Sequence, residues 1–266
     1  MAASEFDTLT YLEAEGDAVM TGSIPPRWDI LGNVNGGALL AVVGAGMQLV
    51  SGRPDPISLT AHYLAPGREG PVQVRAEVAK AGRQFATVTG ALRQGERDLL
   101  RVIGTFGDLA AMAGGYSHVT GGPPVIAPAA DCVPRTTAAP EVAFQEKVQL
   151  LLDPSCAGFW LGAKSGRAEV LGWIGFADER PIDTLALLLM ADALPPTVFN
   201  IDAPAGWVPT LELTVHVRAV PVAGPLRVRI TTSFVHGGMF EEDGEFWDES
   251  GTLVAQSRQL ALLPRT

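Results

Sequence analysis

The sequence predicts an α+β fold made of two similar halves, each an antiparallel sheet wrapped around one helix. The same order of elements occurs twice: a capped apolar helix, then alternating strands that end in a hairpin. The cap positions Asn35 and Asp183 lie 148 positions apart, and the strand residues Thr60 and Thr210 lie 150 positions apart. Two independent landmarks therefore give nearly the same repeat length. A stretch rich in Gly, Ala and Pro separates the two halves, as a linker would.

The helix of the first half is expected to open at Asn35-Gly36-Gly37 and to cover residues 38–50, an apolar stretch. Strands are expected where apolar and polar residues alternate, because such a strand places one face on a core. The strands predicted for this half cover residues 57–64, 72–79, 84–92 and 99–106.

The second half repeats this order. Asp183 stands directly before Thr184-Leu185, where an Asp can cap a helix by accepting from its free backbone N–H groups. The apolar helix that follows is expected to end before Pro195-Pro196. The strands predicted for this half cover residues 210–217, 226–235, 245–248 and 253–262.

These patterns divide the chain into an N-terminal module, residues 1–107, a linker, residues 108–140, and a C-terminal module, residues 141–266. A sheet wrapped around a central helix is called a hotdog, and two in one chain form a double hotdog whose sheets can join into a longer one. Proteins of this fold include thioesterases, dehydratases and proteins without known catalysis. The fold alone therefore does not define an activity.

The composition favours a small-molecule ligand. The formal net charge of −10 over 266 residues argues against nucleic acid or an anionic membrane, because either needs a concentrated basic surface. The longest apolar run, residues 36–47, is shorter than the roughly 20 residues of a membrane span, and no export signal is recognised. Cys132 and Cys156 have no disulfide or metal spacing, which suits a cytoplasmic protein without a metal. We expect Cys156 to be a small core residue.

Asp192 is the most informative single residue, because it stands in an apolar helical stretch where a packed helix would carry another leucine. On a 3.6-residue period it shares the core-facing stripe with Leu185, Leu188 and Leu189. Burying an unpaired carboxylate costs on the order of several kcal/mol, so such an acid needs hydrogen-bonding partners or a chemical role. We therefore assign Asp192 to function and Asp183 to helix capping.

Three segments of the second half resemble the acyl-CoA thioesterase II (TesB-like) family: residues 182–192, which end at Asp192, residues 208–216, and residues 251–259. The first half resembles the same family through Asn35-Gly36-Gly37 and residues 58–67. The resemblance covers most of the chain except the linker. It implies the double-hotdog fold and an acyl-CoA substrate, and we expect no cofactor.

In that family an Asp, a Thr and a Gln hold the water that attacks the thioester, and the match implies these roles for Asp192, Thr210 and Gln259. Thioester hydrolysis needs an acceptor for the water's proton, groups that orient the water, and donors for the oxyanion. A carboxylate can be the acceptor, and a hydroxyl and an amide can orient the water. The helix opening at Gly36 and Gly37 presents free N–H groups at a positive dipole end, where we expect the oxyanion.

Structural explanations compete with each assignment. Asp192 could face solvent near the helix end, and Thr210 shares its alternation with the polar residues 212, 214 and 216. Gln259 lies among apolar residues, so its amide must be hydrogen-bonded if it is buried. Gly36 and Gly37 could serve only helix packing or a tight turn. Where the family has a Gln after the two glycines, this chain has Ala38, so one side-chain amide is missing.

The sequence thus predicts hydrolysis of acyl-CoA to free acid and CoA by direct water attack, in a homodimer or larger homo-oligomer. Two alternatives share the fold: a non-catalytic acyl-thioester binding protein, and an enoyl- or hydroxyacyl-CoA hydratase or dehydratase. The second alternative needs a His beside an acid. The histidines have no metal spacing and are expected to be structural or exposed: His62, His118, His216 and His236. Contacts to the CoA phosphates have candidates by residue type alone: Arg68, Arg83 and Arg218.

Overall fold

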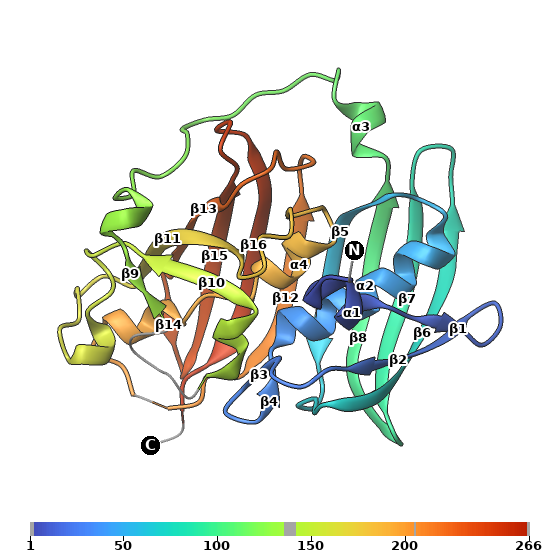
Figure 1. Ribbon diagram of the computed structural model, residues 1–266, viewed down its shortest axis with the longest axis horizontal. Coiled ribbons are helices and arrows are strands. Elements are labelled where there is room, and N and C mark those ends of the chain that lie inside the picture. Colours follow the sequence, from blue (N-terminus) through green and yellow to red (C-terminus); the bar gives the residue numbers. More distant parts are fainter. Residues whose placement is uncertain (1–2, 136–141, 205, 265–266) are drawn as a thin grey trace.

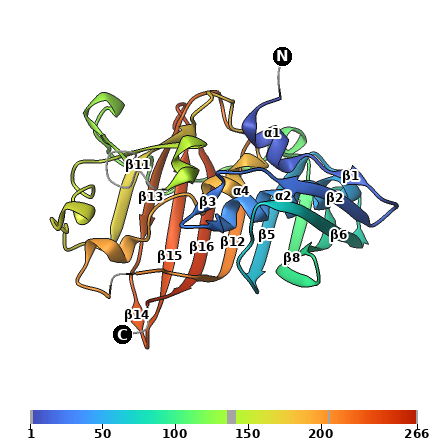
Figure 2. The same ribbon diagram turned by 60° about the horizontal axis from the view of Figure 1, so that its bottom comes forward.

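The computed structural model describes residues 3–135, 142–204 and 206–264. Within them, one antiparallel sheet of 14 strands runs through both halves of the chain. The helices α1 (Glu5–Thr10), α2 (Gly36–Ser51) and α4 (Ala186–Met190) lie together on one face of this sheet (Figure 1, Figure 2). The predicted α+β class and the joined sheets are confirmed.

The first half contributes the strands in the order β1-β2-β6-β7-β8-β5. A separate short hairpin, β3-β4, precedes α2. The four predicted strands correspond to β5 to β8, each at slightly different bounds. The strands of this half are β1 (Glu13–Ala14), β2 (Val19–Ile24), β3 (Asp29–Ile30), β4 (Asn33–Val34), β5 (Asp55–Tyr63), β6 (Gly70–Ala81), β7 (Ala86–Gln94) and β8 (Arg97–Gly107).

The second half continues the sheet in the order β12-β16-β15-β13-β11-β10-β9. Two of its strands, β12 and β16, begin and end where the alternation predicts. The predicted strand 226–235 is divided into β13 and β14, and β15 is longer than the predicted residues 245–248. The strands are β9 (Val133–Pro134), β10 (Val148–Leu152), β11 (Glu169–Phe176), β12 (Thr210–Val217), β13 (Leu226–Thr231), β14 (Val235–His236), β15 (Met239–Trp247) and β16 (Leu253–Leu262).

The two halves join where β5 pairs with β12. Thr60 lies opposite Thr214 in this ladder, and their hydroxyl oxygens are 2.9 Å apart in a hydrogen bond. The halves are related across this junction, because the order β5-β8-β7-β6 on one side is matched by β12-β16-β15-β13 on the other. The helix α4 thus corresponds to α2, as the repeat predicts.

The helix α2 is buried along most of its length, and its start and end follow from its sequence. Asn35 caps it, because its side-chain oxygen accepts from the N–H of Ala38 at 3.0 Å. Gly52 ends it in the left-handed region, with φ of 61°. A Cβ on Gly44 would lie 2.6 Å from the Leu188 side chain, so the absence of a side chain lets α2 and α4 pack closely.

The helix α4 is shorter than the apolar stretch suggests. Asp183 caps it as predicted, with its carboxylate accepting from the N–H of Ala186 at 2.8 Å. The helix ends at Met190, and the N–H of Asp192 donates to Leu189 in a tighter turn at 3.2 Å. The placement of Asp192 on the helical stripe is therefore wrong. The chain turns away ahead of Pro195-Pro196, and this turn aims the Asp192 carboxylate at the start of α2.

The N-terminal helix α1 packs across both halves. Arg180, which precedes α4, donates to Asp7 of α1 at 2.9 Å and to Asp183 at 2.6 Å. Its guanidinium also lies 4.8 Å from the centre of the Phe6 ring. These contacts cover the end of the molecule at which α4 begins.

A segment between the halves, residues 113–128, has no regular secondary structure and runs from the first half to the second (Figure 1). It is attached through Ala127, whose N–H donates to Asp153 at 2.8 Å and whose carbonyl accepts from Trp173 at 3.0 Å. Further along the predicted linker, β9 pairs with β10. Its last residues, 136–140, and residue 141 of the predicted C-terminal module lie outside the described residues.

Candidate active site

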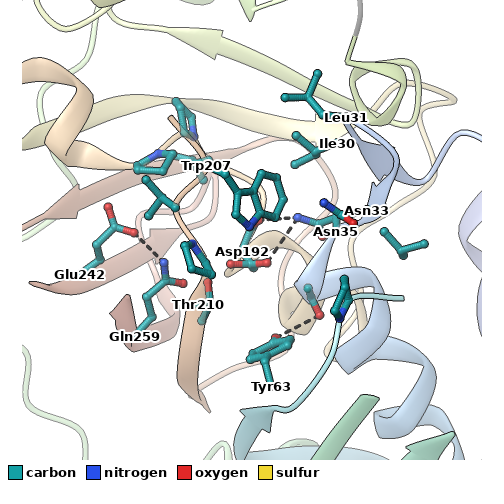
Figure 3. Close-up of a pocket in the computed structure, with 18 of the residues that line it drawn as sticks. Ile30, Leu31, Asn33, Asn35, Tyr63, Asp192, Trp207, Thr210, Glu242 and Gln259 are labelled. Atoms are coloured by element: carbon teal, nitrogen blue, oxygen red, sulfur yellow. Dashed lines mark hydrogen bonds between the residues drawn. The ribbon is translucent and has the colours of Figure 1, made fainter. Parts of the chain in front are cut away.

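A cavity of about 690 Å³ lies between the start of α2 and the strands of the second half. Its volume is in the range of small-molecule sites. Most of its wall is apolar or aromatic: Ile30, Leu31, Val34, Leu39, Phe159, Trp160, Leu194, Phe199, Trp207 and Val208. Its polar wall residues include Asn33, Asn35, Tyr63, Arg135, Asp192, Thr210, Glu242 and Gln259. Figure 3 shows several of these around Asp192.

Asp192 is held by the start of α2 from the other half of the chain. The main-chain N–H of Gly37 donates to its Oδ2 at 2.9 Å. The Asn35 side-chain amide donates to the Asp192 carbonyl oxygen at 2.7 Å and lies 3.4 Å from Oδ2. Burial raises the pKa of Asp192 to about 7, against the opposing effect of the backbone N–H groups of Gly37 and Gly36. The acid is therefore poised to exchange a proton near neutral pH.

The two glycines at the start of α2 are required by close approach. A Cβ on Gly36 would lie 2.7 Å from the Asp192 carboxylate oxygen, and one on Gly37 would lie 2.5 Å from the Leu189 carbonyl oxygen. Neither glycine has a positive φ. In this structure the N–H of Gly37 therefore contacts the acid itself, and its contact with an oxyanion stays a prediction.

Tyr63 supports the same helix start. Its hydroxyl donates to the carbonyl oxygen of Gly36 at 3.0 Å. Burial, followed by the nearby charges of Asp192 and Glu212, raises the pKa of Tyr63 well above its usual value. The phenol therefore stays protonated and remains a hydrogen-bond donor.

Thr210 reaches the cavity because of a β-bulge. Thr210 lies opposite Ala261, but Glu212 lies opposite Leu260, so Leu211 is an extra residue in β12. Without it, Thr210 would point to the same face as Glu212 and Thr214, as the simple alternation predicts. The bulge turns Thr210 to the inner face, where it lines the cavity.

Gln259 is buried on β16 and also lines the cavity. It lies two residues from Ala261, the residue opposite Thr210, so Thr210 and Gln259 are diagonal neighbours on one face of the sheet. Its amide donates to the Glu242 carboxylate at 2.8 Å. Figure 3 shows Thr210 between Gln259 and Asp192. The three side chains predicted to hold the water thus line one cavity.

Sequence reasoning missed Glu242, which lies opposite Gln259 on β15. Its second carboxylate oxygen accepts from the N–H of Thr197 at 2.7 Å. Burial raises the pKa of Glu242 to about 7, against the hydrogen bonds from Thr197, and Asp192 adds to the rise. The alternation of β15 does carry a signal, because Glu242 shares the buried face of the strand with Phe240 and Phe246. The strand predicted here, residues 245–248, begins after Glu242, so the signal was not read.

Sequence reasoning also missed Arg135, a cationic residue in this largely apolar wall. Its guanidinium donates to the carbonyl oxygen of Ala193 at 3.0 Å. Burial lowers the pKa of Arg135 to about 10, so the group is still charged at neutral pH. No carboxylate among the described residues forms an ion pair with it.

Other predicted residues lie away from the cavity. Ala38 is fully buried in the core and does not line it. All four histidines are exposed, as expected, and none lines it. The three arginines considered for CoA phosphates do not line it either: Arg68, Arg83 and Arg218. Cys156 is a buried core residue, as predicted.

The described residues contain neither a candidate metal-binding cluster nor a candidate membrane-spanning helix. No group of three or more His, Cys, Asp or Glu side chains there is placed to hold a metal ion. None of the helices found there combines the length and the apolar character that a membrane crossing requires.

The fold and the cavity define a tandem hotdog protein with its candidate acid at the junction of the two modules. Residues 24–107 match the model of the acyl-CoA thioesterase N-terminal domain, and residues 128–263 match that of the acyl-CoA thioesterase C-terminal domain. The chain belongs to the acyl-CoA thioesterase family, and it is a thioester hydrolase. This confirms the resemblance found in the sequence.

Similar proteins include solved structures that share this fold. A candidate thioesterase II from Thermobifida fusca YX superposes with a TM-score of 0.90 at 30% identity, covering 100% of this chain and 99% of that chain. An acyl-CoA thioesterase II from Mycobacterium marinum gives a TM-score of 0.74 at 18% identity, covering 98% of each chain, which shows the shared fold. An uncharacterized protein of Mycobacterium tuberculosis is 27% identical over 267 residues, covering 92% of this chain and 91% of its own length.

Proposed function

We propose that this protein hydrolyses acyl-CoA to a free acid and CoA by direct attack of water on the thioester carbonyl. The observation that carries the proposal is the Asp192 carboxylate, which lines the cavity while the N–H of Gly37 holds it at 2.9 Å. With its pKa raised to about 7 by burial, Asp192 can accept a proton from water and return it within one cycle.

The attacking water would lie among Asp192, Thr210 and Gln259. Asp192 would accept one of its hydrogens, and the hydroxyl of Thr210 and the amide of Gln259 would fix its remaining hydrogen and one lone pair. The other lone pair would then be directed at the carbonyl carbon. This arrangement replaces a random encounter with a fixed geometry, which lowers the entropic part of the barrier.

The N–H groups at the start of α2 would stabilise negative charge both before and after the water attacks. Before attack, the negative charge is on the Asp192 carboxylate, to which the N–H of Gly37 donates. As Asp192 takes the water's proton, negative charge moves to the former carbonyl oxygen of the substrate. We propose that the N–H groups of Gly36 and Gly37 then stabilise that oxygen, since an N–H at a helix start favours an anion.

The cavity supports an acyl-CoA substrate. Its largely apolar wall suits an acyl group, because each buried CH₂ contributes about 0.8 kcal/mol to binding. The family models and the Mycobacterium marinum relative carry the name of acyl-CoA thioesterases. A homo-oligomer in the cytoplasm remains our prediction, and light scattering of the purified protein tests its oligomeric part.

The test is the hydrolysis of a panel of acyl-CoAs with detection of the free thiol. We expect measurable turnover in the natural chain and a fall of at least roughly 10²-fold in Asp192→Asn, as is typical when a general base is removed. The control is Asp202→Asn, an exposed acid outside the cavity. Equal turnover in the natural chain and Asp192→Asn would favour the alternative of an acyl-thioester binding protein. Hydration of an enoyl-CoA would favour the hydratase alternative.

A further inference from the structure

We propose that Glu242 is a positioning residue that turns the amide of Gln259 so that its oxygen, and not its nitrogen, faces the attacking water. This inference rests on the proposed function, because it assigns the direction of one hydrogen bond to that water. Three groups form a hydrogen-bonded chain on which this role depends: Thr197, Glu242 and Gln259.

Both carboxylate oxygens of Glu242 have a fixed partner. Oε1 accepts from the main-chain N–H of Thr197 at 2.7 Å, and Oε2 accepts from Nε2 of Gln259 at 2.8 Å. Glu242 and Gln259 are 7% and 8% exposed, and Thr197 is fully buried. Water therefore offers few competing partners, and the orientation of each group is set by the next.

The two ends of an amide are chemically different, because the nitrogen only donates and the oxygen only accepts. Above its raised pKa of about 7 the Glu242 carboxyl is ionised and only accepts, so it binds the nitrogen end of Gln259 and repels the oxygen end. Figure 3 shows the nitrogen of Gln259 directed to Glu242 and its oxygen directed to the side of Thr210. Gln259 thus presents an acceptor to the cavity.

An acceptor at this place fits the needs of the attacking water. The water has two hydrogens, and Asp192 accepts one of them. With the oxygen of Gln259 accepting the other, both hydrogens are held and the reactive lone pair is free for the carbonyl carbon. If the nitrogen of Gln259 faced the water instead, it would donate to a lone pair and weaken the nucleophile. Glu242 therefore acts on the reaction through Gln259, without touching the substrate's reacting atoms.

The decisive variant is Glu242→Gln. Its amide can keep the bond from Thr197 with its oxygen, and its nitrogen then donates to Gln259 and reverses that residue's amide. We expect kcat to fall roughly 10- to 10²-fold with little change in KM, since one oriented hydrogen bond is lost at the reacting water. The matched control is Glu241→Gln, because Glu241 is the neighbouring acid, lies outside the cavity, and accepts from the main-chain N–H groups of Ser233 and Phe234.

The reciprocal double variant separates positioning from a structural role. In Glu242→Gln with Gln259→Glu, the amide at 242 donates to a carboxylate at 259, which again presents an acceptor to the cavity. We expect the double variant to recover at least a part of the kcat lost in Glu242→Gln. Thermal unfolding of both variants checks that each is folded before kinetics are compared.

The outcomes are distinct from those that test the proposed function. If folded Glu242→Gln had the same kcat as the natural chain while Asp192→Asn was inactive, the positioning role of Glu242 would be overturned. The proposed thioester hydrolysis would still stand. A double variant no faster than Glu242→Gln would also count against it. A loss of kcat that the reciprocal change reverses supports it.

Discussion

The N–H of Gly37 donates to the Asp192 carboxylate at 2.9 Å across a sequence separation of 155 residues. Asp192 and Gly37 come from different halves of the chain, so the acid is fixed only when α2 and the turn after α4 pack together. The same contact brings the positive end of α2 to a group whose burial favours its neutral form. The balance of these two effects leads to the first two predictions.

Hydrolysis should increase with pH through the neutral range. The pKa of Asp192 is raised to about 7, and only its ionised form can accept a proton from water. We therefore expect kcat/KM to fall about tenfold per pH unit below this value and to level off above it. A pH profile of kcat/KM from pH 5 to 9 measures this. A profile that is flat between pH 5 and 7 would contradict the role of Asp192 as the base.

The ionisation of Asp192 that increases activity should decrease the stability of the folded protein. Since burial raises the pKa of folded Asp192 above its ordinary value of 3.8, the folded state binds its proton more tightly than the unfolded state. The natural chain should lose stability relative to Asp192→Asn as pH rises from about 4 to about 7. Thermal unfolding at pH 5 and pH 8 should show a larger advantage of Asp192→Asn at pH 8, and an equal advantage at both would contradict it.

Gly37→Ala should destabilise the protein. The new Cβ would lie 2.5 Å from the Leu189 carbonyl oxygen, which belongs to the backbone and cannot rotate away. Overpacking of this kind costs about 1–3 kcal/mol. Chemical denaturation measures the change, with Gly114→Ala as the control, because a Cβ there meets nothing within 4 Å. Similar unfolding midpoints for the two variants would contradict the close approach.

Thr210→Val should lower kcat roughly tenfold, because it removes the hydroxyl but keeps the shape of the side chain. Thr214→Val is the control, since Thr214 faces away from the cavity and its hydroxyl pairs with Thr60 at the junction of β5 and β12. It should affect stability but not kcat. If both variants lowered kcat equally, the inward orientation that the bulge gives Thr210 would have no bearing on the reaction.

Arg135→Gln should raise KM for acyl-CoA with little effect on kcat. Arg135 lines a mostly apolar cavity, stays charged at neutral pH, and has no ion-pair partner among the described residues. It is therefore available to an anionic part of the substrate, and we expect a rise in KM of about tenfold, equal to about 1.4 kcal/mol. Arg218→Gln is the control, as Arg218 is exposed, follows the end of β12 and lies outside the cavity. An unchanged KM in Arg135→Gln would contradict this contact.

Much of the fold could be predicted because the alternation of residues determines which face of a strand is buried. It gave the bounds of β12 and β16, and the cap at Asp183 marked the helix of the second half. It failed to indicate β2, β10 and β11, whose place in the sheet depends on pairing with strands far away in the sequence. The length of α4 also depended on packing, since its apolar residues continue beyond the helix end.

The candidate site was predictable only in part. The residue types of Asp192, Thr210 and Gln259 indicated it, but the alternation of β12 placed Thr210 on the wrong face, because a bulge has no clear signal in a single sequence. Glu242 was missed because the predicted strand began after it, although it shares the inward parity of Phe240 and Phe246. Arg135 could not be found, since its contact with the Ala193 carbonyl joins segments that are distant in the sequence.

The duplicated architecture raises the question of a second site, at the start of α4. There the hydroxyl of Thr184 donates to Asp55 at 2.8 Å, and the other oxygen of Asp55 accepts from the N–H of Leu109 at 2.8 Å. Both residues are buried, and α1 with Arg180 covers this end of the molecule. The counterpart location is thus filled by the protein's own side chains. A titration with a non-hydrolysable acyl-CoA analogue should accordingly saturate at a stoichiometry of one per polypeptide, half that of two equivalent modules.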